Sequence, residues 1–568
     1  MGPIKLYSIL SFIVLLVIGV FGVLLGDGRA QEYLGAGRRP MNTYQQQVAK
    51  TYSDLKIPAK RIPFNEFCYP TKFKLQNPQK FMGRYMAPGT SNMSMLGFHR
   101  IGAGKTCASI TACKLWLGQG KPLVIMPAGL IPGFRDELRG PCGGYLSRER
   151  LDEIKELAAS SPRYKEIIGQ ANEAIDADFD ILSYNKFATD HAKYHPPILV
   201  VDEVHNMLNP AGTYFRALSK FINTRPKMKV ILLSATPVFD HVEELVWLLR
   251  LLRVTVDAET LLDENKLCAQ VTQVVSYFAG APDYTYPAVK LHYKICHMSK
   301  FQTKWYRAEV QAERSKMGNI RLKPVGDSFF SKSRARSNIV FARGLSGTDG
   351  LPKMTKDVLR RDLATYSCKF PKLIRKLQQG KLSFVYTSFS SFGGIKTIQK
   401  CLNAFGWRDF RKHGVGPKRY AIWTGEQTAR EKDAIRKTFN DPANDGAKQI
   451  QCVIGSPAMK EGVSLLRVRH VHAMEPYWNN SRMEQIYGRA IRFCSHKSLP
   501  RDDRSVDIYL YIAVTADVKS GRNFRKLQPE QSVDAYIVNI SDEKIALTNK
   551  VLGVMIDCAA DRGLNQSN

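Results

Sequence analysis

HRIGAGKT, residues 99–106, is the stretch that decides the fold expected for this chain. It follows an apolar run, Met93–Phe98, and precedes a segment compatible with a helix, Cys107–Leu117. Its two glycines let backbone N–H groups close around an anion, and the start of a helix adds a positive dipole. Lys105 can reach the β- and γ-phosphates of a nucleotide, and the Thr106 hydroxyl can bind Mg²⁺. The stretch therefore predicts a phosphate-binding loop between a strand and a helix.

The loop departs from the complete GxxxxGK[ST] pattern, because His99 stands where that pattern has a glycine. Taken alone, the stretch is also compatible with a glycine turn that binds no nucleotide. Three further segments, in order along the chain, favour the nucleotide.

The second segment is ILVVDEVHN, residues 198–206. Its four apolar residues predict a buried parallel strand, and two carboxylates follow at the carboxyl end. Asp202 is placed to hold Mg²⁺, directly or through water, and Glu203 to orient or deprotonate the attacking water. Acidic residues also occur at strand ends as solvated groups, so this pair indicates a Mg²⁺ site only together with the other segments.

The third segment, VILLSATPV at residues 230–238, is another apolar run, and it ends in Ser234, Ala235 and Thr236. Strands that end in polar residues beside a phosphate loop are typical of an open α/β sheet, where ligands bind outside the carboxyl ends of the strands. An ordinary helix cap or turn is the alternative for these three residues.

The fourth segment, QIYGRAIR at residues 485–492, lies much further along the chain. Arg489 and Arg492 are three residues apart, so they would share one face of a helix. An ATPase needs a cation against the charge that develops on the γ-phosphate, and an arginine there can raise the rate by about 10³–10⁵. Two arginines on a basic chain prove nothing alone, but four such segments in this order indicate an ATPase.

Together the segments GxGKT, DEVH, SAT and QxxGRxxR resemble the superfamily 2 helicases and translocases of nucleic acid, across roughly residues 65–515. Four longer segments are similar to ATPases of large cytoplasmic DNA viruses, namely the poxvirus early transcription factor small subunit, nucleoside triphosphatase I and iridovirus-type helicases. The resemblance implies a viral α/β protein with two RecA-like parallel-sheet domains in tandem, and with ATP and Mg²⁺ as cofactors. The four segments are HMSKFQ (297–302), YTSFSSFGG (386–394), FNDPANDGAKQIQCVIGSPAMKEGVSLLRVRHVHAMEP (439–476) and GRAIRFCSHKSLP (488–500).

The resemblance also implies roles for individual residues. Asp202 and Glu203 would act on Mg²⁺ and water, residues 234–236 would couple hydrolysis to movement, and Gly462 would lie near both nucleic acid and nucleotide. Gln79 stands where the family places a glutamine that contacts adenine, although Pro78 replaces the usual basic residue or histidine before it. The residues that would hold the phosphates, or face them from the second domain, are Gly102, Ala103, Gly104, Lys105 and Thr106, and Gln485, Arg489 and Arg492.

The composition favours a polyanionic partner. Lys and Arg total 83 against 51 Asp and Glu, a formal charge of +32, and each phosphate contact made by such a surface releases counterions. A basic surface without a partner is the alternative. Beside an ATPase core, nucleic acid is the more economical explanation, with DNA favoured over RNA and the viral transcription machinery as a further partner.

The cysteines do not form a recognisable framework. Eleven are scattered from Cys68 to Cys558 without a CxxC pair, and the histidines do not cluster. This distribution argues against a zinc site and against a set of disulfides. We expect buried, reduced thiols in a cytosolic protein.

Leu6–Leu25 carries no charge and is long enough for one helical crossing of a membrane. A membrane anchor, a cleaved signal peptide and an extension that the folded enzyme does not use are three explanations. Gly28–Ala30 resembles a signal-peptidase site, but export would separate the enzyme from ATP. Because three arginines follow the segment and one lysine precedes it, we expect an anchor with the catalytic part on the cytosolic side, in the cytoplasm of an infected cell or in the virion.

The expected organisation follows the motifs. In the middle of the chain, FFSKSRARSNIVFAR at residues 329–343 mixes aromatic and basic residues, so it would contact nucleic acid or form a solvated basic loop. Residues 147–177 would be surface helices, and buried strands are expected within 382–389, 419–425, 450–456 and 468–475. The expected parts are the hydrophobic segment 1–25, a polar linker 26–64, a first RecA-like domain 65–255, a middle segment 256–360, a second RecA-like domain 361–515 and a helical tail 516–568.

Three function classes remain open: a helicase that separates strands, a translocase or early-transcription ATPase that remodels promoter or transcription complexes without processive unwinding, and a nucleic-acid-binding subunit that does not hydrolyse ATP. The intact set of Lys105, Asp202, Glu203 and the two arginines argues against the third class. We expect an ATP-dependent helicase or translocase that hydrolyses ATP between its two RecA-like domains.

Overall fold

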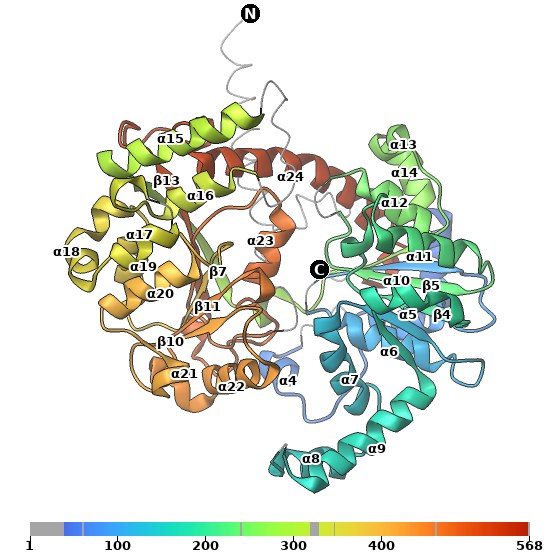
Figure 1. The fold of residues 1–568 in the computed structure, drawn as a ribbon. Helices are drawn as coiled ribbons and strands as arrows, with labels where there is room; N and C mark the ends of the chain where they lie inside the picture. The colour runs from blue at the N-terminus through green and yellow to red at the C-terminus, as the bar shows by residue number, and fades with distance from the viewer. Residues whose placement is uncertain are drawn as a thin grey trace, which may run out of the picture. The chain divides into compact units, whose positions relative to one another are not determined.

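The computed structural model describes residues 39–58, 62–100, 102–158, 160–238, 241–317, 329–345, 347–459 and 463–565. These residues divide into two units (Figure 1). Domain 1 contains the described residues up to Thr285 and those from Ala546 onward, and domain 2 contains residues 286–545. Each domain is a sheet of parallel strands with helices around it, which confirms the expected α/β class with two parallel-sheet domains.

Two predicted features lie outside the described residues: the hydrophobic segment 6–25 and Gly462. Among the helices that the structure does describe, none combines the length and the apolar character needed to span a bilayer.

The sheet of domain 1 has the strand order β3-β2-β4-β5-β1-β6, and every neighbouring pair is parallel. The strands β1, β4 and β5 are the apolar runs named above, and they and β2 are buried along their whole length. Parallel strands are apolar throughout when helices cover both faces of their sheet, because neither face contacts water. The strands are β1 (Ser94–His99), β2 (Leu123–Met126), β3 (Asp180–Ser183), β4 (Ile198–Val201), β5 (Lys229–Ser234) and β6 (Val275–Phe278).

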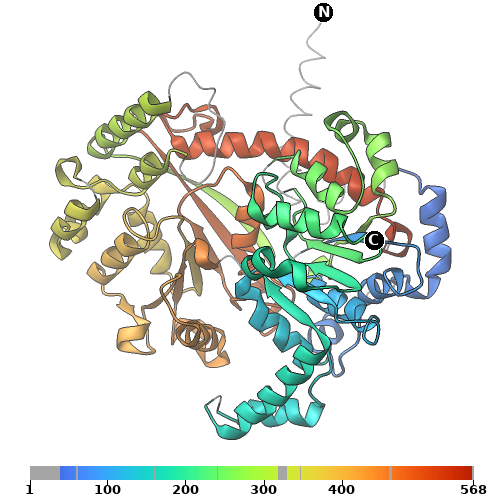
Figure 2. The same cartoon turned by 45° about the vertical axis from the view of Figure 1, so that its right-hand side comes forward.

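Helices and two apolar clusters complete domain 1 on either side of its sheet. Helices α8 and α9 lie side by side, extend away from the sheet in both views (Figures 1 and 2) and have a small apolar cluster of their own around Ile167, as expected for surface helices at 147–177. The helices are α3 (Thr43–Thr51), α4 (Phe64–Cys68), α5 (Asn77–Tyr85), α6 (Lys105–Lys114), α7 (Ile131–Arg139), α8 (Arg148–Glu156), α9 (Pro162–Asp178), α10 (Tyr184–Asp190), α11 (Thr213–Asn223), α12 (Glu244–Leu251), α13 (Ala258–Leu262), α14 (Glu264–Val271) and α25 (Arg562–Asn565).

The sheet of domain 2 has the order β7-β13-β12-β8-β11-β10-β9 and is also parallel throughout. Its strands β8, β10, β11 and β12 fall within the four segments predicted to be buried strands. The strands are β7 (Ala288–His297), β8 (Ser383–Tyr386), β9 (Arg408–Asp409), β10 (Arg419–Trp423), β11 (Cys452–Gly455), β12 (His470–Ala473) and β13 (Ser505–Val514).

One long helix, α24 (Val533–Asp557), begins in domain 2 and ends in domain 1, so the chain returns to its first domain at the end. It covers 25 of the 53 residues of the predicted helical tail 516–568. The other helices of domain 2 are α15 (Lys300–Met317), α16 (Ser331–Asn338), α17 (Gly347–Lys353), α18 (Lys356–Tyr366), α19 (Phe370–Leu377), α20 (Ile395–Ala404), α21 (Phe410–His413), α22 (Ala429–Asn440) and α23 (Asn480–Tyr487).

Two segments expected outside the two RecA-like domains are folded into the domains instead. Helix α3 lies in the expected linker 26–64, but its Val48 is buried in an apolar cluster of domain 1 and its Gln45 is almost fully buried. The expected middle segment 256–360 supplies an edge strand to each sheet, β6 to domain 1 and β7 to domain 2. The sequence pattern missed these strands because neither is a long apolar run: β6 is the four-residue VSYF, and β7 is AVKLHYKICH, which is mostly half-buried.

The basic and aromatic segment 329–343 is neither a solvated loop nor a nucleic-acid surface at its centre. Arg334 is 1% exposed, and its guanidinium lies 5.2–5.5 Å from the ring centres of Phe389, Tyr477 and Trp478. Arg336 donates from Nε to Glu309 Oε2 at 2.7 Å. Both expectations are therefore wrong for Arg334, which is buried among aromatic rings, whereas Arg336 is half-buried in an ion pair and its contact with nucleic acid stays a prediction.

The prediction that the cysteines are all reduced is also wrong. Cys107 is bonded to Cys142, and Cys268 to Cys558. The paired residues are 35 and 290 positions apart, with Cα atoms 5.8 and 5.4 Å apart, so only the fold brings them together. Five cysteines are free and buried, as predicted: Cys113, Cys296, Cys368, Cys401 and Cys452.

Candidate functional site

The phosphate loop, residues 99–106, joins the fully buried strand β1 to helix α6, as the sequence predicts. Gly102 and Gly104 have φ angles of 82° and 78°, in the region that favours glycine. Ala103 N–H donates to the carbonyl of Arg100 at 3.1 Å and closes the turn. The first backbone N–H groups of α6 have no acceptor within the helix, so this turn and helix start fit an anion.

Lys105 and Gln79 both contact the backbone of this loop. Lys105 is half-buried, and its Nζ donates to the carbonyl of His99 at 3.3 Å. Gln79, on α5, donates from Nε2 to the carbonyl of Gly104 at 3.3 Å and accepts at Oε1 from the N–H of Gln76 at 2.8 Å. A Cβ atom at Gly104 would come within 2.4 Å of the Gln79 amide. The structure therefore brings Gln79 against the loop, where its amide bridges α5 and the phosphate turn.

The DEVH segment follows β4, where Asp202 N–H donates to the carbonyl of Ile125 on β2 at 2.9 Å. Glu203 has a φ angle of 51°, and its N–H donates to Asp202 Oδ1 at 3.0 Å. The Tyr184 hydroxyl donates to the carbonyls of Asp202 and Glu203, at 2.5 and 3.0 Å. Sequence reasoning missed Tyr184, because nothing in the pattern of its own segment links it to the carboxylates.

A histidine joins the DEVH and SAT segments. His205 Nδ1 is 3.1 Å from Ser234 Oγ and 3.4 Å from Glu203 Oε2. The same Ser234 oxygen accepts from the N–H of Thr236 at 3.0 Å. His205 belongs to the DEVH motif but was not singled out from the sequence, since its contact with β5 is a property of the sheet order.

The phosphate loop and these two segments lie at one edge of the sheet. Strands β4, β5 and β1 are neighbours in that order, and each of the three segments begins at the carboxyl end of its strand. Ligands of open parallel sheets bind at this edge. Hydroxyl and carboxylate oxygens are the ligands that Mg²⁺ prefers, so Thr106 and Asp202 fit that ion in the presence of a nucleotide.

In domain 2, Gln485 and Arg489 line one small cavity together with Phe384, Tyr386 and Arg482. Arg489 is buried, and its Nε donates to the carbonyl of Gln485 at 3.0 Å. The predicted helix ends earlier than expected: α23 ends at Tyr487, Arg489 lies in the turn that follows, and Arg492 lies in an irregular stretch after that turn.

The helix stops there because Gly488 follows, and glycine opposes helix continuation. The prediction that the two arginines share one helix face is therefore wrong. Arg492 is half-buried, and burial lowers the pKa of its guanidinium. Its Nε donates to the carbonyl of Gly488 at 3.0 Å.

Family models match both domains. The SNF2-related domain matches residues 46–264, and the helicase conserved C-terminal domain matches residues 368–494. "Putative ATP-dependent RNA helicase R563" of Acanthamoeba polyphaga mimivirus is 36% identical over 505 residues, covering 83% of this chain and 88% of that protein. The chain belongs to the viral SNF2-related helicases. The chain is therefore a helicase-like ATPase of superfamily 2, of the viral type.

Two more distant viral SNF2-related helicases extend the comparison. "Putative helicase 087L" of Invertebrate iridescent virus 3 is 26% identical, over 91% of this chain and 57% of that protein. "Termination factor NPH-I homolog" of African swine fever virus is 23% identical, over 80% of this chain and 73% of that protein. These relatives confirm the resemblance to viral helicases and to nucleoside triphosphatase I on which the expected function depends.

Proposed function

We propose that this chain is a nucleic-acid-dependent ATPase that moves along its polymer. The contact between His205 and Ser234 carries the proposal, because it links the carboxylates that act on ATP to the segment after the next strand. A movement of the DEVH segment on ATP hydrolysis would then be transmitted to the SAT segment, at the end of β5, through this hydrogen bond. The net charge of +32 supports nucleic acid as the polymer.

The chemistry follows from the residues at the sheet edge. Lys105 and the N–H groups at the start of α6 would bind the phosphates, and Glu203 would align the attacking water. Thr106 and Asp202 would hold Mg²⁺, which neutralises phosphate charge when it is bound. Gln79 would support the phosphate turn from α5.

Arg489 and Arg492 of domain 2, with Gln485, would act on the γ-phosphate when the domains close on ATP. This step would make hydrolysis depend on domain closure, and so on the polymer that both domains bind. It is the part of the proposal that rests on the family alone.

A second candidate function is an ATPase that acts on transcription complexes without separating strands. The relationship to an African swine fever virus protein named as a termination factor homolog favours it. The residues would act on ATP in the same way, and only the polymer and the partner would differ. For either function we propose the cytoplasm of an infected cell, or the virion, as the place of action.

ATP hydrolysis by the full chain tests the proposal, measured without polymer and with single-stranded DNA, duplex DNA or RNA. Glu203→Gln should abolish the stimulation, whereas Glu173→Gln, on the exposed face of α9, should leave it intact. Stimulation by duplex DNA alone would favour translocation, and stimulation by single strands with strand displacement would favour a helicase. Absence of hydrolysis with every polymer would contradict the proposal.

Transcript release from a stalled transcription complex separates the second candidate from the first. A termination ATPase should release RNA without unwinding a free duplex.

A further inference from the structure

The last described residues of the chain pack against the sheet of domain 1. Val554, Met555 and Cys558 belong to the apolar cluster that includes Leu199 of β4, and Ala560 and Leu564 belong to the cluster that includes Val200 of the same strand. Strand β6 is at the edge of the sheet, and the carbonyl of its Val275 accepts from the N–H of Ala560 at 2.8 Å. The C-terminal segment, defined here as residues 558–565, therefore covers the edge next to β6.

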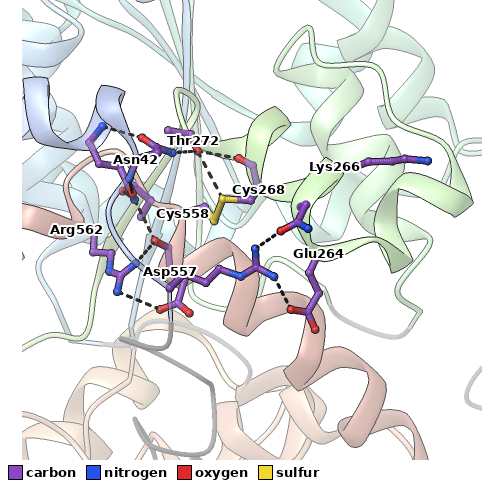
Figure 3. Close-up of a disulfide and its surroundings, with 12 residues drawn as sticks. Asn42, Glu264, Lys266, Cys268, Thr272, Asp557, Cys558 and Arg562 are labelled. Carbon is purple, nitrogen blue, oxygen red and sulfur yellow. Dashed lines mark hydrogen bonds and ion pairs between the residues drawn. A yellow bond between two sulfur atoms is a disulfide. The ribbon is translucent and has the colours of Figure 1, made fainter.

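Several contacts fasten this segment (Figure 3). Cys558 is bonded to Cys268 on α14, and the Arg562 guanidinium lies beside Asp557, donating from Nη1 to its carbonyl at 2.8 Å. From α3, Gln45 Nε2 donates to the carbonyls of Asp557 and Ala559, at 3.0 and 2.8 Å. The segment is thus held by elements from the start, the middle and the end of domain 1.

A buried polar chain leads from this segment to the phosphate loop. Asp561 accepts at Oδ2 from the Ser276 hydroxyl at 2.7 Å and at Oδ1 from the N–H of Tyr277 at 3.0 Å. Ser276 Oγ is 3.0 Å from His99 Nε2. Asp561, Ser276 and His99 are all fully buried.

When Asp561 is ionised, these hydrogen bonds have a single direction. Because Ser276 donates its only proton to Asp561, its oxygen accepts from His99 Nε2, so the ring proton is on Nε2. Burial, with the nearby Lys105 ammonium, lowers the pKa of His99 to about 3 and keeps the ring neutral. An oriented neutral histidine is therefore held at the start of the loop.

His99 is both the last residue of β1 and the first of the phosphate loop. Its carbonyl is the acceptor for Lys105 Nζ at 3.3 Å. Contacts thus run from Asp561 to Ser276, from Ser276 to His99 and from His99 to the lysine expected to bind the phosphates. The next residue, Arg100, donates from its N–H to the carbonyl of Phe278 on β6 at 3.1 Å, so the loop is tied to the same edge strand twice.

We propose that Asp561 and Ser276 are positioning residues of the nucleotide site: through His99 they hold the start of the phosphate loop and Lys105 in the geometry that binds ATP. The proposal rests on the proposed function, in which Lys105 binds the phosphates. It makes the C-terminal segment part of the ATPase site, although more than 450 residues separate Asp561 from Lys105 along the chain. Small displacements of a site geometry lower activity strongly, by up to about 10² for 1 Å.

The test uses the full chain with Ser276→Ala and Asp561→Asn. Ser94→Ala is the matched control, because Ser94 is also a buried serine of this sheet, donating to the carbonyl of Leu252 at 2.6 Å, but at the opposite end of β1. The measurements are the Kd of fluorescently labelled ADP, the KM and kcat for ATP and the melting temperature. Lys105→Ala, measured in parallel, checks the proposed function itself.

We expect Ser276→Ala and Asp561→Asn to raise the Kd for ADP and the KM for ATP by about tenfold. Ser94→Ala should lower the melting temperature as Ser276→Ala does, without changing Kd or KM. Wild-type Kd and KM in both Ser276→Ala and Asp561→Asn, or equal changes of Kd and KM in Ser94→Ala, would overturn the proposal. If Ser276→Ala does not fold, the result for Asp561→Asn decides. If Lys105→Ala still binds ADP as the wild type does, the proposed function fails instead.

Discussion

The pair formed by Lys369 and Asp534 should show strong energetic coupling in domain 2. Both side chains are fully buried, and Lys369 Nζ is 2.7 Å from Asp534 Oδ2. Two unit charges at that distance attract by about 6 kcal/mol at an effective dielectric constant of about 20. Desolvation of the two ions offsets most of this attraction, so the pair adds little net stability, but removing one partner leaves a buried charge and costs about 3–5 kcal/mol.

Lys369 and Asp534 also make other buried hydrogen bonds, so removing either side chain should destabilise domain 2 strongly. Lys369 also donates to Asn338 Oδ1 at 2.9 Å and to the carbonyl of Met474 at 2.6 Å. Asp534, in the first turn of α24, accepts from the N–H of Ala513 on β13 at 2.9 Å. The pair therefore joins α19, β13 and the start of α24 in one buried network.

The measurement is a double-mutant cycle with Lys369→Met and Asp534→Asn. Each single variant should lower the free energy of unfolding of domain 2 by about 3–5 kcal/mol, and the double variant by about 2–3 kcal/mol less than their sum. Hydrogen exchange of peptides from β13 across a urea series reports the stability of this domain. Lys372→Met, in the first turn of the helix α19 that Lys369 precedes, is the control: it removes one hydrogen bond, to the carbonyl of Ile295 at 2.6 Å, and should cost about 1 kcal/mol.

Strict additivity in the double variant would refute the reasoning, because it would mean that neither charge responds to the loss of the other. A cost for Lys369→Met no larger than that of Lys372→Met would refute it equally.

Three further predictions concern the nucleotide site. His205→Ala should lower polymer-stimulated hydrolysis about tenfold more than basal hydrolysis, because it breaks the link to Ser234; equal losses in the two rates would contradict this. Arg489→Lys should lower kcat by about 10²–10³ with little change in KM, since lysine cannot reproduce the planar fork of arginine, and an unchanged kcat would remove Arg489 from the site. Burial raises the pKa of Asp561 to about 6, so the native state holds a proton between about pH 4 and pH 6 that the unfolded chain has lost, and stability must fall as pH rises through this window. The free energy of unfolding of the wild type relative to Asp561→Asn should therefore fall by about 2 kcal/mol between pH 4 and pH 6, as measured by urea unfolding, and a difference independent of pH would disprove the assignment.

The local structure around the candidate nucleotide site could be predicted from the sequence. Each part of it is an apolar run followed by a polar segment, and short-range rules suffice for a strand, a glycine turn and a helix start, as at Lys105. The helix end at Tyr487 was missed because the prediction relied on the spacing of two arginines and did not consider the low helix propensity of Gly488. Such a competition is settled by small differences in backbone preference.

The non-local parts could not be predicted in this way. Ser276 and His205 matter because strands that are remote in sequence are neighbours in the sheet, and Asp561 matters because the C-terminal segment lies against β6. Arg334 is a basic residue in an unremarkable basic segment, and only the fold surrounds it with aromatic rings. The disulfide of Cys268 and Cys558 joins residues 290 positions apart, which no local spacing encodes.

The return of the chain to domain 1 has a consequence for protein synthesis. About 260 residues of domain 2 are translated between Thr285 and Ala546, which takes about 13–50 s at roughly 5–20 residues per second. During that time the nascent domain 1 lacks the segment that covers the edge beside β6, and exposed strand edges are prone to pairing with other chains. The ribosome therefore releases a protein whose first domain to be translated is the last to be completed, and a premature stop near the C-terminus should harm the beginning of the protein as much as its end.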